Sequence, residues 1–79
     1  MDTVQTAEIN IGKAIKAERK RQGLTQQQLG ERMGIQKAQV SKIENGKHPT
    51  YSSITRAFRA LGAKTASIDL GEMGRVALW

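Results

Sequence analysis

The amino-acid sequence predicts a mainly α-helical domain of four to five helices that is followed by a C-terminal β-hairpin. Three observations favour this fold class. Apolar residues recur at helical spacing as far as residue 61, glycines follow the segments that show this spacing, and apolar and polar residues alternate from residue 65 onward. The 79 residues suffice for one small domain. We therefore expect a helical domain at residues 9–63 and a hairpin element at residues 64–79.

The first helix is expected over residues 9–22. Ile11 and Ile15 are four residues apart there, and Gly23 follows as a residue that ends helices cheaply. Residues 1–8 show no strong apolar period. We expect them to form a frayed or short lead-in to the helix.

The second helix is expected to begin at Thr25, because Thr25 and Gln28 have the spacing of a capping box. Leu29 supplies its apolar stripe, and Gly34 ends it by entering the left-handed conformation. Ile35 follows directly and is apolar within a tight turn. We therefore expect the turn to pack inward and to lead into a third helix.

Two further helices follow this turn. The third is expected from Gln36 or Lys37 to Asn45, and Gly30 is the small residue expected where the second helix approaches it. Thr50 is expected to cap the fourth helix. The apolar face of that helix has the spacing i, i+3, i+4, i+7 and consists of Ile54, Ala57, Phe58 and Leu61.

The last fifteen residues are expected to form two strands, at 65–70 and 75–79, around a turn at 71–74. A two-stranded hairpin alone is only marginally stable in water. We therefore expect it to form a homodimer, either by strand pairing across a two-fold axis or by face packing. The alternative is a hairpin folded back on its own domain. The residues expected in the dimer interface are Ile68, Leu70, Val76, Leu78 and Trp79.

The charge is unevenly distributed along the chain. The formal net charge is +6 overall and +9 within residues 13–64, which contain twelve of the lysines and arginines. A basic central segment is typical of a surface that binds a polyanion. A basic surface that is simply solvated remains the alternative.

Several classes of protein are disfavoured by composition. The chain has no cysteine and one histidine, His48, so we expect no metal site and no cofactor. No nucleophile–base pair or phosphate loop indicates an enzyme. No apolar run approaches the ~20 residues of a membrane span, and the N-terminus lacks the features of a signal peptide. We therefore expect a cytoplasmic protein without a membrane partner.

A dense and ordered set of residues begins at the predicted helix-turn-helix of segment 24–46 and continues beyond it. Its members are Leu24-Thr25-Gln26, Leu29, Gly34-Ile35, Val40-Ser41, Ile43-Glu44-Asn45-Gly46-Lys47, Pro49 and Leu61-Gly62. This set resembles the Cro/C1 (XRE) family of helix-turn-helix regulators, and the similarity covers about residues 11–63. The resemblance implies a lambda-repressor-like domain that binds double-stranded DNA, usually as a dimer. Gly30 departs from the family pattern, which has alanine there, and the hairpin lies outside it.

In this family the third helix is the recognition helix, which reads base edges in the major groove. Lysine can donate to guanine, glutamine can pair with adenine, and alanine can contact a thymine methyl group. Some of the long side chains are alternatively expected to reach phosphates only. The candidate base-reading residues are Gln36, Lys37, Ala38, Gln39 and Lys42.

A second group of residues is expected to hold the DNA backbone. Thr25 and Gln26 begin the second helix, where free N–H groups and the helix dipole attract anions. For Thr25 a purely capping role is the alternative, and both roles are compatible. The full set of candidate phosphate ligands is Thr25, Gln26, Ser41, Asn45, Lys47 and Tyr51.

The resemblance also implies a salt bridge between Arg19 and Glu44, which would join the first and third helices. The alternative is that Arg19 forms no such bridge and is a solvated cation within a run of basic residues.

The sequence thus predicts a sequence-specific transcriptional repressor associated with the nucleoid. The alternative is an antitoxin, whose partner would be a toxin protein and which would also regulate its own operon.

Overall fold

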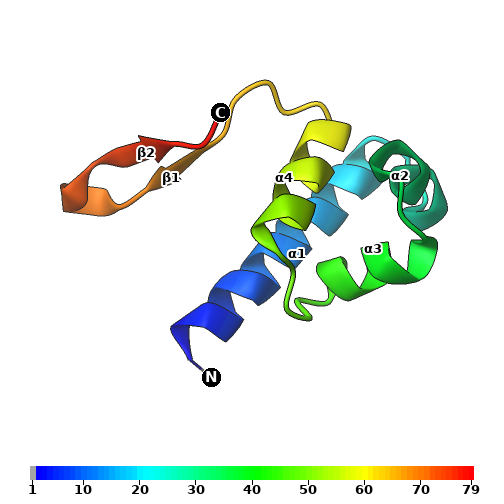
Figure 1. The fold of residues 1–79 in the computed structure, drawn as a ribbon, viewed down its shortest axis with the longest axis horizontal. Helices are drawn as coiled ribbons and strands as arrows, with labels where there is room; N and C mark the ends of the chain where they lie inside the picture. The colour runs from blue at the N-terminus through cyan, green and yellow to red at the C-terminus, as the bar shows by residue number, and fades with distance from the viewer. Residues whose placement is uncertain (1) are drawn as a thin grey trace.

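The computed structural model of the chain describes residues 2–79, and residue 1 lies outside the described part. It has the expected fold class: four α-helices form one body, and a two-stranded antiparallel hairpin extends away from it (Figure 1). The elements are α1 (Thr3–Arg21), α2 (Gln26–Met33), α3 (Lys37–Glu44), α4 (Tyr51–Ala60), β1 (Ser67–Asp69), the 3-10 turn η1 (Gly71–Met73) and β2 (Arg75–Ala77).

The first helix begins earlier than the sequence predicted. It starts at Thr3, so the expectation of a frayed lead-in is wrong from residue 3 onward. Asp2 caps the helix by accepting a hydrogen bond from the Gln5 backbone N–H, at 2.7 Å. The added turns have no apolar period because solvent surrounds most of them. They are held at Ile9, which packs against the backbone of Gly46.

The predicted boundaries of α2 are confirmed. The Thr25 hydroxyl accepts from the Gln28 N–H at 3.0 Å, and the Gln28 side chain accepts from the Thr25 N–H at 2.8 Å. This reciprocal pair satisfies two backbone donors at the start of the helix. At the other end Gly34 has a φ of 74°, which an L side chain adopts only at a cost.

The four helices enclose a single small core. Leu29, the predicted apolar residue of α2, and Val40 of α3 are fully buried, and Ile35 is partly buried in the turn as expected. Each of the four helices contributes to this core, so none of them is an appendage. The buried apolar residues are Ile15, Leu29, Met33, Val40, Ile43, Ala57 and Leu61.

Two glycines allow the backbones to approach closely. A Cβ at Gly12 would lie 2.5 Å from the Glu44 carbonyl oxygen, so α1 and the end of α3 touch through their main chains. A Cβ at Gly30 would lie 2.7 Å from the Ile35 carbonyl oxygen. The alanine of the family pattern would therefore collide with the α2–α3 turn in this chain. Gly12 has no helix-breaking role, which is why the sequence analysis missed it.

The hairpin strands are shorter than the predicted spans 65–70 and 75–79. Ile68 pairs with Val76 at the centre of a three-residue ladder. Beyond the ladder, Ala66 and the last two residues exchange backbone hydrogen bonds, including one of 2.8 Å from the Leu78 N–H to the Ala66 carbonyl. The Trp79 ring then lies 5.2 Å from the Arg59 guanidinium of α4. The base of the hairpin is thus attached to α4, while its tip extends away from the helices (Figure 1).

Replacement of Gly12 tests the close contact of α1 with α3. Gly12→Ala should gain about 1 kcal/mol of helix propensity, but the collision with backbone atoms should outweigh it, for a net loss of roughly 1–3 kcal/mol. Urea unfolding measures this loss. The control is Lys13→Ala, which removes an exposed side chain from the same helix. A Gly12→Ala protein as stable as the control would contradict the contact.

Candidate nucleic-acid interface

Arg19 and Glu44 form a buried ion pair at the junction of α1 and α3. The Arg19 Nε lies 2.7 Å from Glu44 Oε2, and Arg19 Nη2 donates to Glu44 Oε1 at 3.0 Å. The two side chains are 9% and 2% exposed. This two-point geometry is the strongest arrangement available to an arginine and a carboxylate. The hydrogen bond to Glu44 raises the pKa of the Arg19 guanidinium above its ordinary value.

The ion pair also reaches α2. Arg19 Nη1 donates to the carbonyl of Leu24, the residue directly before the Thr25 cap of α2, at 2.8 Å. Gln26 Nε2 donates to Glu44 Oε1 at 3.2 Å. One buried carboxylate therefore connects α1, the start of α2 and the end of α3. The amide of Gln26, a candidate phosphate ligand, retains a second N–H that this contact does not use.

The candidate base-reading residues lie together on one side of α3. Lys37, Ala38, Gln39 and Lys42 are all exposed, while Val40 and Ile43 face the core. A hollow of about 710 Å³ lies between α2 and α3. Gln36, Ala38, Gln39 and Lys42 line it on the α3 side. Lys37 is not among its lining residues and extends from the first turn of the helix.

Gln39 has a capping role that the sequence analysis did not anticipate. Its Oε1 accepts from the Gln36 backbone N–H at 3.0 Å, and Gln36 is the N-cap residue of α3. A bidentate contact with adenine needs both the oxygen and the nitrogen of the amide. The amide oxygen has two lone pairs, so Gln39 can accept a second hydrogen bond while it keeps the capping bond, which fixes the orientation of its amide.

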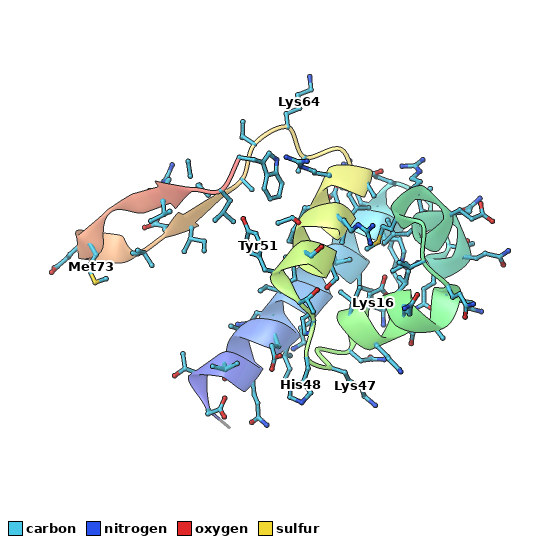
Figure 2. The ribbon with its side chains drawn as sticks, in the orientation of Figure 1. Lys16, Lys47, His48, Tyr51, Lys64 and Met73 are labelled. Atoms are coloured by element: carbon cyan, nitrogen blue, oxygen red, sulfur yellow. The ribbon has the colours of Figure 1, made fainter. Side chains whose placement is uncertain are left out.

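The candidate phosphate ligands are divided between three places, and Thr25 and Gln26 occupy the first of them, at the start of α2. Asn45 and Lys47 lie in the loop after α3, beside the N-terminal part of α1, and Asn45 Nδ2 donates to Ser41 Oγ at 3.4 Å. Tyr51 does not join them. It lines an apolar groove that faces the hairpin, and Figure 2 shows it on that side of α4, apart from Lys47.

Negative charge lies close to the loop that contains Lys47. The Glu8 Oε2 is 3.4 Å from the Nδ1 of the exposed His48, which neighbours Lys47 (Figure 2). Glu8 belongs to the helix because α1 begins at Thr3, and it reaches His48 from there. Glu31 similarly lines the hollow between α2 and α3. The surface is therefore basic overall, with two carboxylates at its margins.

The basic residues do not all gather on this surface. Lys37, Lys42 and Lys47 have no carboxylate within 4.0 Å in residues 2–79, so their charges are available to a ligand. Three arginines border a different hollow, between α2 and α4, that no α3 residue lines. They are Arg32, Arg56 and Arg59. Six of the twelve basic residues of segment 13–64 thus lie in these two areas of the fold.

Two further features concern residues 2–79 as a whole. That part of the chain contains no group of three or more His, Cys, Asp or Glu side chains placed to hold a metal ion. None of its helices is both long enough and apolar enough to cross a membrane.

The buried ion pair can be tested by a double-mutant cycle on Arg19→Met and Glu44→Gln. Each single change leaves an unpaired buried partner and should cost about 3–5 kcal/mol of unfolding free energy. The double variant should lose less than the sum of the two, because neither charge remains. The control cycle uses the exposed pair Glu18 and Arg21, which should couple weakly. Additive losses at Arg19 and Glu44 would contradict the geometry.

The described geometry agrees with a comparison to known families. A family model described as Helix-turn-helix (HTH_3) matches residues 15–68, which include α2, α3 and α4 entirely. No curated protein matches the chain. The family match covers more than half of the sequence and ends within β1. The chain therefore belongs to the Cro/C1-type (XRE) helix-turn-helix family of DNA-binding transcription regulators.

Proposed function

We propose that the protein is a repressor that reads the major groove of duplex DNA with the exposed side of α3. One observation carries this proposal: the exposed side of α3 bears lysines without a carboxylate partner, and its buried side is fixed by the Glu44 ion pair. Lys37 and Lys42 present free ammonium groups on that face, and Glu44 anchors the same helix to Arg19. A rigid helix presenting free donors is what direct readout of base edges requires.

The proposed base contacts differ between residues. Lys37 stands in the first turn of α3, the part of a recognition helix that meets base edges, and it is the main candidate for guanine. Lys42 lies further along and reaches either a base or a phosphate. Ala38 offers a methyl group to thymine. Gln36 and Gln39 act as a unit, because Gln39 caps the helix at Gln36 in the free protein.

The start of α2 and the loop after α3 are proposed to hold the phosphates. The Gln28 N–H is already bonded to the Thr25 hydroxyl, which leaves the N–H groups of Gln26 and Gln27 to bind an anion at this helix end. Ser41, Asn45 and Lys47 are proposed to contact the backbone on the other side of α3. Tyr51 is the weakest member of this set because it lines the groove beside the hairpin.

We also propose that the protein acts as a homodimer through its hairpin. Strand residues point alternately to opposite sides of a sheet. One side of the hairpin is apolar, with Ile68 opposite Val76, and the other carries Asp69 and Arg75, whose charged groups are 3.8 Å apart. A dimer would present two copies of α3 to half-sites about 34 Å apart, or a multiple of that distance.

The second candidate function is that of an antitoxin, and the exposed apolar side of the hairpin is the observation that favours it. A toxin would cover Ile68 and Val76, which are 47% and 49% exposed. Co-expression with the product of the adjacent gene distinguishes the two functions. A stable complex that also neutralises the toxicity of that product would support the antitoxin.

Lys37→Ala tests the base-reading role of α3. Specific binding should fall by roughly 1–3 kcal/mol, while non-specific binding should change little. Fluorescence anisotropy with a duplex selected from a random library and with an unrelated duplex measures both affinities. Binding of either duplex should weaken with salt, with a slope near −0.9 per phosphate neutralised.

The control for Lys37→Ala is Lys64→Ala, which removes an exposed lysine from the linker beyond α4 (Figure 2). Equal losses of specific and non-specific binding would make Lys37 a phosphate contact. A salt-independent affinity would refute DNA binding by this surface.

Val76→Glu tests the dimer. Val76 lies on the apolar side of the hairpin and Ala77 on the polar side, so Val76→Glu should give a monomer and Ala77→Glu should not. Sedimentation equilibrium of the full-length chain and of both variants measures their mass. A monomeric unmodified chain would refute the dimer.

A further inference from the structure

An apolar groove of about 400 Å³ lies between the helical body and the base of the hairpin. Ile11 of α1 and Ile54 and Phe58 of α4 line one side, and Ile68 and Leu78 line the other. The hairpin thus stands beside α4 without closing onto it, as Figure 1 shows. An open apolar groove in a domain this small is a surface that a partner would cover.

Only some residues on the apolar side of the hairpin line the groove. Ala66, Ile68 and Leu78 line the groove. Val76, which pairs with Ile68, does not line it, and neither does Leu70, which lies nearer the tip. Leu70 is 42% exposed, Val76 is 49% exposed, and Met73 in the turn is 80% exposed. Figure 2 places Met73 at the far end of the hairpin from α4. One chain therefore carries both an apolar groove and a projecting apolar tip.

A buried donor at the base of the hairpin lacks a partner. The indole Nε1 of Trp79 is buried and has no hydrogen-bond acceptor within residues 2–79. The ring is held in place by its contact with Arg59. Buried N–H groups are nearly always hydrogen-bonded in folded proteins. The base of the hairpin therefore carries one unsatisfied donor, and Trp79 is positioned there by its contact with Arg59.

We propose that the hairpin tip of a second copy of this chain occupies the groove, with Leu70 and Met73 as its inserted residues. This inference rests on the proposed homodimer and specifies how its two chains contact each other. Two hairpins that cross in antiparallel orientation about a two-fold axis place each tip over the base of the other. Both grooves are then filled, and the assembly closes without leaving a free tip.

The properties of the tip match those of the groove. A volume of about 400 Å³ is near the lower end of the range for small-molecule pockets, so it admits a few side chains and not a whole domain. Methionine is flexible and adapts to irregular apolar cavities. The polar side of the hairpin, with Asp69 and Arg75, stays in solvent in this arrangement. Edge-to-edge strand pairing would instead leave the apolar side of both hairpins uncovered.

Disulfide trapping tests the contact directly, because the chain has no cysteine of its own. Thr55 lines the groove and Met73 lies at the tip. Full-length Thr55→Cys and Met73→Cys proteins are mixed, allowed to exchange subunits and oxidised gently. A mixed disulfide between the two should become the main product on a non-reducing gel, because a disulfide requires Cα atoms within roughly 7 Å. Each variant oxidised alone should remain largely uncross-linked.

The matched control replaces Thr55→Cys with Ser52→Cys, an exposed position of α4 that does not line the groove. This mixture should give little mixed disulfide. Val76→Cys, oxidised alone, reports edge pairing. A dimeric protein that cross-links through Val76→Cys and not through the mixture would overturn the groove contact and leave the dimer intact. A monomeric chain with no cross-link in any mixture would overturn both.

Discussion

The buried pair of Arg19 and Glu44 fixes how α1, α2 and α3 meet. The helices α2 and α3 have eight residues each and are too short to be stable alone. Their positions come from packing and from this pair, which also binds the Leu24 carbonyl and the Gln26 amide. A charge buried without its partner is costly, so the pair favours the single arrangement in which α3 meets α1 at the correct angle. The orientation of the proposed base-reading side chains follows from that arrangement.

Two glycines also allow these helices to pack closely. Gly12 lets the end of α3 approach α1 at the level of the main chain, and Gly30 does the same for the α2–α3 turn. Close packing of this kind gives rigidity but adds little apolar burial. A chain of 79 residues buries only about 60% of its unfolded surface. The hairpin, whose apolar side remains exposed in one chain, is the part of the molecule that would supply further burial on association.

The sequence predicted the features that local chemistry determines. The Thr25 capping box, the left-handed Gly34 and the alternation at the hairpin are read from neighbouring residues, and all three are present. The sequence did not predict features that depend on contacts between residues far apart in the chain or on side-chain conformation. Residues 3–8 are helical although they lack an apolar period, because Asp2 caps them and Ile9 packs on Gly46. The capping bond from Gln36 to Gln39 and the position of Tyr51 beside the groove depend on side-chain conformations that spacing does not specify.

The proposal that α3 reads DNA is tested most directly by mapping amide chemical shifts during titration with the selected duplex. We expect the largest changes at residues 25–27, 36–42 and 45–47, with much smaller changes at the tip of the hairpin and along the α4 residues Arg56 and Arg59. The same duplex should leave the shifts of Arg19 and Leu24 nearly unchanged, because the anchor is already formed. Large changes confined to the α2–α4 hollow or to the hairpin, with α3 unaffected, would contradict the proposal.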